Sequence, residues 1–222
     1  MGGNNLASAI IHYTISSALL KKLEITDQNR FLLGAAIGPD ASSHLDGTYD
    51  IAHFGCKTAD GSKKGIHWKH FAQKYEKNLL ADDFFWGYYC HLIQDAIWLH
   101  DVADKYVRCY QKEEKKRATQ RGYRDYERLN YLLIKEFHLQ RIEFDIVELP
   151  LREISMENLF VLCKSFEQWF DSGYCSKDDL DIYKWDIILE YIGKCISFCA
   201  SEISALRNEK KGVEPEELFV RV

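Results

Sequence analysis

Proline is the residue that most often interrupts a helix, and this chain of 222 residues contains only three, Pro39, Pro150 and Pro215. Between them, apolar residues recur at helical spacing, beginning with residues 6–22. No series of alternating apolar and polar residues predicts a set of strands. The length suits one domain with a substantial core. We therefore expect an all-α fold, built as a single multi-helix domain over residues 1–222.

The charge and cysteine content exclude several classes of protein. The chain has 29 basic and 34 acidic residues, a net charge of −5, so the basic surplus typical of a dedicated DNA binder is missing. No apolar run approaches the roughly 18–20 residues that span a bilayer. The 7 cysteines are odd in number and form no CxxC pair, and the first residues do not resemble an export signal. We expect reduced cysteines and a cytoplasmic location.

The helical pattern changes along the chain, and three parts can be distinguished. Residues of about 7–106 hold most of the histidines and form the expected metal-site half, about 107–207 form a helical second half, and 208–222 form a polar, frayed tail. The expected helices cover residues 6–22, 27–38, 67–75, 82–110, 129–139, 155–170 and 177–207. The dense charge run over 111–130 predicts a solvated helix face or an exposed turn.

A long segment without helical pattern runs from Pro39 to about Gly65. It is rich in Gly, Asp, Ser and Thr, and three histidines lie in it or at its exit, His44, His53 and His67. Loops of more than about 12–15 residues are uncommon in compact domains unless they are functional or disordered. This segment is therefore expected to be a loop that contributes to a site.

The most informative residues are His91 and Asp95, four residues apart. This spacing places an imidazole and a carboxylate on one face of a helix, where both can reach the same cation. Their neighbours are apolar, which predicts that the pair points inward, and an unpaired buried carboxylate is costly. Trp98 lies on the same face and is expected to wall a pocket. A surface ion pair is the alternative interpretation.

Three further residues are candidates because of their surroundings. His12 lies on the apolar side of the first helix, where a core histidine satisfied by one hydrogen bond is the commoner occupant. Asp40 follows a helix that Gly38-Pro39 ends, and His53 stands between apolar neighbours in an otherwise polar segment. His44 is close to Asp40 in sequence and is a reserve ligand.

In order, the motifs IIHYTISSALL, FLLGAAIGPD, DIAHF and FFWGYYCHLIQDAIW resemble the zinc-dependent phospholipase C family, which is related to the single-strand-specific zinc nucleases. The resemblance is closest to a bacterial branch of uncharacterised hydrolases and covers roughly residues 7–106. It implies an all-helical fold and five metal ligands: His12, Asp40, His53, His91 and Asp95. It also implies that Asp95 bridges two zinc ions, with His12 on the second, and that Asp40 is the general base.

The chain departs from the family pattern where a third zinc site would lie. His100 follows His91 by nine residues, which turns it to the opposite side of an ideal helix, and His138 has Ile142 rather than an acid four residues later. We therefore expect one or two ions, zinc or else manganese or iron. Two close cations would suit a hydrolase acting on a small-molecule phosphoester, with Asp40 as the catalytic residue.

Two other functions compete with this interpretation. The adjacent pair His100-Asp101 is typical of HD-type phosphohydrolases, which would also need an upstream histidine and a later aspartate. The candidates for these are His67 or His70, and Asp125 or Asp145. A non-catalytic helical binding module, with a structural metal or none, is the other alternative. The sequence leaves the substrate and the oligomeric state open.

Overall fold

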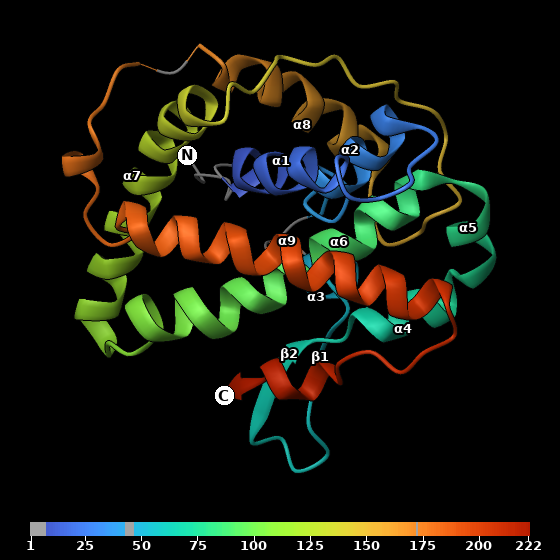
Figure 1. Cartoon of the computed structure of the whole chain (residues 1–222). Helices are drawn as coiled ribbons and strands as arrows, with labels where there is room; N and C mark the ends of the chain where they lie inside the picture. Colours follow the sequence, from blue (N-terminus) through green and yellow to red (C-terminus); the bar gives the residue numbers. More distant parts are fainter. Residues whose placement is uncertain (1–7, 43–46, 172) are drawn as a thin grey trace.

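The central element of the fold is helix α1 (Ser8–Leu19), which contacts α2, α6, α7, α8 and α9 (Figure 1). We describe residues 8–42, 47–171 and 173–222 from a computed structural model of the chain. Ile10, Ile15 and Leu19 of α1 are fully buried, because neighbours cover the helix on several sides. The described chain is mostly helical, as the sequence predicts.

The other helices pack around α1 or against its neighbours, and three of them begin directly after a capping side chain that the sequence provides. Asp27, Asp82 and Ser155 each accept a hydrogen bond from a backbone N–H in the first turn of the helix that follows, at 3.0, 2.9 and 3.3 Å. The α-helices that follow α1 are α2 (Gln28–Ala36), α3 (Thr48–Ala52), α4 (Trp68–Lys74), α5 (Glu76–Ala81), α6 (Asp83–Ile97), α7 (Lys112–Glu136), α8 (Met156–Trp169) and α9 (Trp185–Arg207). A π-helix, η1 (Trp98–Arg108), continues α6, and η2 (Lys177–Asp179) and η3 (Pro215–Leu218) are 3₁₀ turns.

Helices α2 and α6 cross at two glycines, one on each helix. A Cβ atom on Gly34 would lie 2.1 Å from the Phe84 carbonyl oxygen, and one on Gly87 would lie 2.0 Å from the Phe31 carbonyl oxygen. No side chain fits at either position, so the two backbones are in direct contact. This contact places the C-terminal end of α2 beside the middle of α6.

The segment from Pro39 to Gly65 contains regular structure, contrary to the expectation of a loop. It holds α3 and the hairpin of β1 (Gly55–Lys57) and β2 (Lys63–Ile66), to which β3 (Val220–Arg221) adds in the antiparallel order β1-β2-β3. The C-terminal strand lies beside this hairpin in Figure 1. The expected frayed tail is therefore docked.

The docking of the tail has a side-chain cause that no local pattern could reveal. Leu218, Phe219 and Val220 are almost fully buried. The Phe219 ring packs against the backbone of Gly65, since a Cβ on that glycine would lie 2.3 Å from the ring. Apolar burial of this kind stabilises even a very short strand.

Two helix boundaries also differ from the sequence prediction. The charge run of 111–130 and the helix expected over 129–139 form one continuous helix, α7. The last helix begins at Trp185 rather than near Lys177, because the buried carboxylate of Asp125 accepts backbone N–H groups of Ile182 and Tyr183 at 2.6 and 3.0 Å and holds this segment outside the helix. Among the described residues, no helix has both the length and the apolar character needed to cross a membrane.

The glycine crossing makes a prediction about stability. Gly34→Ala or Gly87→Ala should lower the free energy of unfolding by roughly 3 kcal/mol or more, because the added methyl group collides with backbone that cannot move aside. The measurement is urea unfolding followed by circular dichroism. Gly193→Ala is the matched control, since nothing lies within 4 Å of its Cβ position on α9, and it should raise stability by up to about 1 kcal/mol. Equal free energies of unfolding for the three variants would contradict the close contact between α2 and α6.

Candidate metal centre

Four side chains from three segments converge at one point. Asp40 follows α2, His53 follows α3, and His91 and Asp95 lie one turn apart on α6. One ligand atom from each lies within 4.8 Å of all the others. The Asp95 Oδ2 atom is 3.2 Å from His53 Nε2 and 3.3 Å from His91 Nε2, and Asp40 Oδ1 is 3.4 Å from His53 Nε2. The inward orientation predicted for His91 and Asp95 is observed.

The outer nitrogen of each imidazole is fixed by a hydrogen bond. His91 Nδ1 donates to the Ala35 carbonyl oxygen and His53 Nδ1 donates to the Tyr49 carbonyl oxygen, both at 2.9 Å. A carbonyl oxygen can only accept, so each Nδ1 carries a proton and each Nε2 faces the cluster, where the neutral ring offers a lone pair to a cation. Metal-binding histidines are usually held in this manner.

The inner nitrogens provide the test of whether a cation fits. His53 Nε2 and His91 Nε2 are buried and make no hydrogen bond of acceptable geometry, although carboxylates stand close by. Buried polar atoms are rarely left unsatisfied, and each costs about 1–3 kcal/mol. Two imidazole nitrogens and two carboxylates form a donor set that suits zinc and also manganese or iron. The four residues therefore fit a divalent metal ion.

His12 approaches the same carboxylate from its other side. Its Nε2 atom lies 3.2 Å from Asp95 Oδ1, whereas His53 and His91 face Oδ2. Its Nδ1 atom is 2.8 Å from Gln94 Oε1, and its ring stacks on that of His91 with centroids 3.9 Å apart. Asp95 thus has one oxygen toward His53 and His91 and the other toward His12, an arrangement that would allow it to bridge two cations.

Electrostatics in the cluster favour ionised carboxylates. Burial acts to raise the pKa of Asp95, but the surrounding histidines outweigh it and hold that pKa well below its usual range. Burial acts to lower the pKa of His53, but the close carboxylates of Asp40 and Asp95 outweigh it and raise that pKa to about 9. The pKa of His91 is lowered, by burial and then by the neighbouring His12. The cluster therefore attracts positive charge, as a proton or a metal ion.

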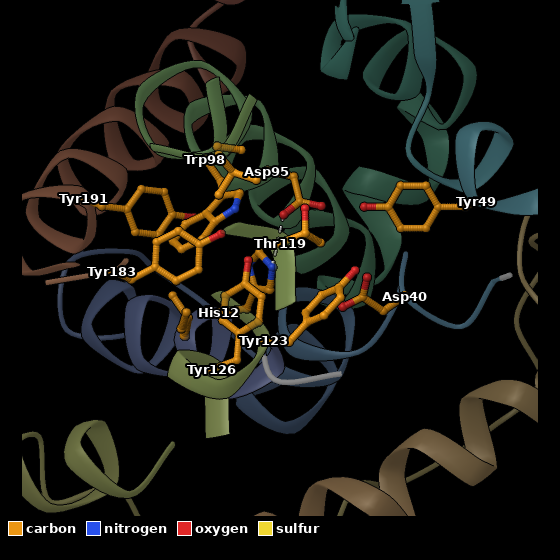
Figure 2. A pocket seen from close by; sticks show the side chains of 13 residues that line it. His12, Asp40, Tyr49, Asp95, Trp98, Thr119, Tyr123, Tyr126, Tyr183 and Tyr191 are labelled. Carbon is orange, nitrogen blue, oxygen red and sulfur yellow. Dashed lines mark ion pairs between the residues drawn. The ribbon is translucent and has the colours of Figure 1, made fainter. Parts of the chain in front are cut away.

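A chamber of about 210 Å³ adjoins one side of the cluster (Figure 2). Trp98 lines it and lies 4.9–5.6 Å, ring centroid to ring centroid, from three tyrosines that also line it. Burial raises the pKa of Tyr183 to about 12 and those of Tyr126 and Tyr191 further, so these hydroxyl groups remain neutral. The chamber is lined by Ile11, His12, Asp40, Tyr49, Asp95, Trp98, Ala103, Val107, Thr119, Tyr123, Tyr126, Tyr183 and Tyr191.

A second, larger cavity of about 600 Å³ lies on the hairpin side of the cluster. We call it the hairpin lobe. It shares Tyr49, Asp95 and Trp98 with the chamber, so the two spaces meet at the metal centre. Its other lining residues are Asp50, His53, Gly55, Cys56, Lys57, Lys64, Gly65, Ile66, Leu99 and Arg108.

The remaining histidines lie elsewhere. His44 is outside the described residues. His67 and His70 stack on each other with centroids 3.4 Å apart, and His67 Nε2 lies 3.4 Å from Glu216. The cluster of four is the one group of candidate metal ligands found in the described ranges, and it contains neither His100 nor His138.

The residues of the HD-type alternative are engaged in other interactions. His100 and Asp101 contact each other at 2.9 Å, and Asp101 also pairs with Lys105 and Lys194. Burial acts to raise the pKa of Asp101, but hydrogen bonds from Lys194 and His100 outweigh it and lower that pKa. The buried Asp125 accepts backbone N–H groups instead of facing an imidazole.

Several residues of the site could not be found by motif. Ala35 contributes only its backbone carbonyl, and the chamber tyrosines come from α3, α7, α9 and the segment before α9. The only sequence signal was the number of tyrosines, 13 in the chain. Trp98 was predicted as a pocket wall from its spacing to His91, and it lines both cavities.

The geometry has no counterpart in the comparisons with known proteins. No protein-family model, no curated protein and no solved structure matches the chain. The fold and the site define a mostly helical protein with a candidate metal centre. Any narrower assignment has to be argued from the residues of this chain.

The cluster predicts which side chains metal binding requires. Purified protein should contain at least about one equivalent of zinc, manganese or iron, and His91→Ala should remove nearly all of it, because a bound cation loses a buried neutral ligand. Metal content by mass spectrometry after dialysis measures this. Asp101→Ala is the control and should leave the content unchanged. Loss of metal from the control but not from His91→Ala would support the HD-type alternative.

The position of His12 makes a separate prediction about the number of ions. If Asp95 bridges two ions, His12→Ala should reduce a stoichiometry of two to one, while the ion at His53 and His91 remains. Zinc titration with a competing chelator measures both the number and the affinity of the sites. If the wild-type protein and His12→Ala each bind one zinc ion, His12 is not a metal ligand and only holds the Asp95 carboxylate in position.

Proposed function

We propose that the protein is a metal-dependent hydrolase that acts on a phosphoester. The observation that carries the proposal is the convergence of Asp40, His53, His91 and Asp95 at the junction of two cavities. Structural zinc sites are usually closed by four protein ligands, whereas catalytic sites keep a position open to substrate. The cluster also offers four protein ligands, so the argument for catalysis comes from the cavities and not from the number of ligands. Access from both cavities favours catalysis over a purely structural metal or a binding module.

We further propose that the chain is related to the zinc-dependent phospholipase C and zinc nuclease family. The support is the order of the motifs that hold His12, Asp40, His53, His91 and Asp95, together with a mostly helical fold that brings these residues into contact. Under this proposal zinc is the metal and one or two ions bind. His12 and Asp95 Oδ1 would face the second ion.

The residues around the metal centre would have different roles in hydrolysis. A divalent metal bound here would lower the pKa of a water molecule and polarise a phosphoryl oxygen. Asp40, a carboxylate that also lines the chamber, would accept the proton of the attacking water. His53 and His91, held by the Tyr49 and Ala35 carbonyl oxygens, would keep the ligand geometry fixed. Trp98 and the neutral tyrosines would exclude water and hold an uncharged part of the substrate.

The cavity dimensions favour a small-molecule substrate. A chamber of about 210 Å³ is smaller than the roughly 300–1,000 Å³ of typical ligand pockets, so it holds only part of a ligand. The remainder would occupy the hairpin lobe. A small phosphoester with one group in each space fits this division.

Replacement of Asp40 tests the proposal. Metal-loaded protein should hydrolyse bis(p-nitrophenyl) phosphate or p-nitrophenyl phosphate. Asp40→Asn should reduce kcat by about 100-fold or more, because the amide keeps an oxygen ligand but cannot accept a proton. Release of p-nitrophenol measures the rate, and metal analysis of the same sample shows whether the ion is retained. His100→Ala is the control and should keep full activity.

The result that would contradict the proposal is equally specific. Metal-loaded protein that hydrolyses neither these esters nor a panel of small phosphate esters would favour a binding module with a structural metal. Full activity in Asp40→Asn would exclude Asp40 as the base.

A further inference from the structure

The hairpin lobe has a basic edge that the metal centre does not need. Lys57 of β1 and Lys64 of β2 are directly opposite each other in the antiparallel register, and both line the lobe. Residues paired in this way project from the same face of a sheet, about 4.5–5.5 Å apart at Cβ. Neither lysine forms an ion pair with any residue in the described ranges. Two unpaired ammonium groups therefore border the space next to the candidate metal site.

Arg108 adds a third positive group from a different element. It lies at the end of η1, where its Nη2 atom donates to the Arg221 carbonyl oxygen at 2.7 Å and its Nε atom lies 3.2 Å from Asp104. These contacts hold the guanidinium group in place at the lobe. Its charge is partly balanced by Asp104, so the lysines provide most of the uncompensated charge.

The acidic residues of the lobe do not cancel this charge. Asp95 belongs to the metal cluster, which leaves Asp50 as the only other acid among the described residues that line the lobe. The chamber, by contrast, has only aromatic, apolar and hydroxyl groups beyond the cluster and the adjoining His12. The two cavities therefore differ in chemistry, one uncharged and the other basic.

We propose that the hairpin lobe binds a second anionic group of the substrate, so that the ester hydrolysed at the metal centre carries another phosphate or carboxylate. This inference rests on the proposed function for the group at the metal, while the anion site stands on Lys57, Lys64 and Arg108. Ammonium and guanidinium groups form strong charge-assisted hydrogen bonds with such anions. An anion between Lys57 and Lys64 would also relieve the repulsion between them.

Non-hydrolysable probes separate anion binding from catalysis. We would titrate the zinc-loaded full chain by calorimetry with propylphosphonate, with alkane bisphosphonates of two to six methylene groups, and with matched phosphonocarboxylates. The best bisphosphonate should bind about tenfold more tightly than propylphosphonate, the gain expected for one charge-assisted contact. The phosphonocarboxylates decide whether the second anion is a carboxylate or a phosphate.

Lys63 provides a matched control on the same strand. It neighbours Lys64 but projects from the opposite face of the sheet, and it does not line the lobe. The double variant Lys57→Gln/Lys64→Gln should lose most of the gain from the second anion and keep the affinity for propylphosphonate. Lys63→Gln should keep both affinities. All three side chains are exposed, so folding should not be affected.

Three outcomes would overturn the inference. They are no gain at any linker length, a gain that survives the double variant, and an equal loss in Lys63→Gln, which would indicate a general effect of charge. Tighter competition by a single-stranded oligonucleotide, with dependence on Lys63, would identify an extended polyanion instead. An ester hydrolysis assay on the same zinc-loaded protein separates the two proposals. Lysine-dependent binding of the bisphosphonate by protein that hydrolyses no phosphate ester would leave the anion site standing and refute the hydrolase proposal.

Discussion

The direct backbone contact between α2 and α6 is the constraint on which the candidate site depends. Gly34 and Gly87 have no side chains, so each helix lies against a carbonyl group of the other. This contact brings the Ala35 carbonyl oxygen within hydrogen-bonding distance of His91 Nδ1. It also places Asp40, which follows α2, next to the α6 ligands. The packing of this helix pair therefore also sets the geometry of the candidate metal ligands.

Asp95 connects this helix pair to the rest of the cluster. One of its oxygens faces His53 and His91 and the other faces His12 of the central helix, so a single carboxylate receives three imidazoles. In a buried site these interactions are much stronger than in water, and they hold the carboxylate ionised. The same arrangement that lowers the pKa of Asp95 prepares it to bind a cation.

The walls of the two cavities come from distant parts of the chain. The π-helix η1 continues the ligand helix and contributes Trp98 to both cavities and Arg108 to the hairpin lobe, and π-helices often occur at functional sites. Asp125 on α7 binds the backbone before α9 and so places Tyr183 in the chamber. The C-terminal strand supports the hairpin that holds Lys64. Substrate selection, as proposed above, would thus depend on the second half of the chain.

The sequence alone determined the helical class and the capped helix starts, and it predicted His91 and Asp95 as a pair, because these depend on spacing within one turn and on side-chain chemistry. His12, Asp40 and His53 became candidate ligands through the resemblance of their motifs to a known family. The pair His91 and Asp95 needed only a helix to share a face. The three-stranded sheet, the docked C-terminal tail and the aromatic chamber were decided by tertiary structure. A three-residue strand has no period to detect, and the burial of Phe219 against Gly65 joins positions more than 150 residues apart in the sequence. Contacts of that range have no local pattern, since only the folded chain brings their partners together.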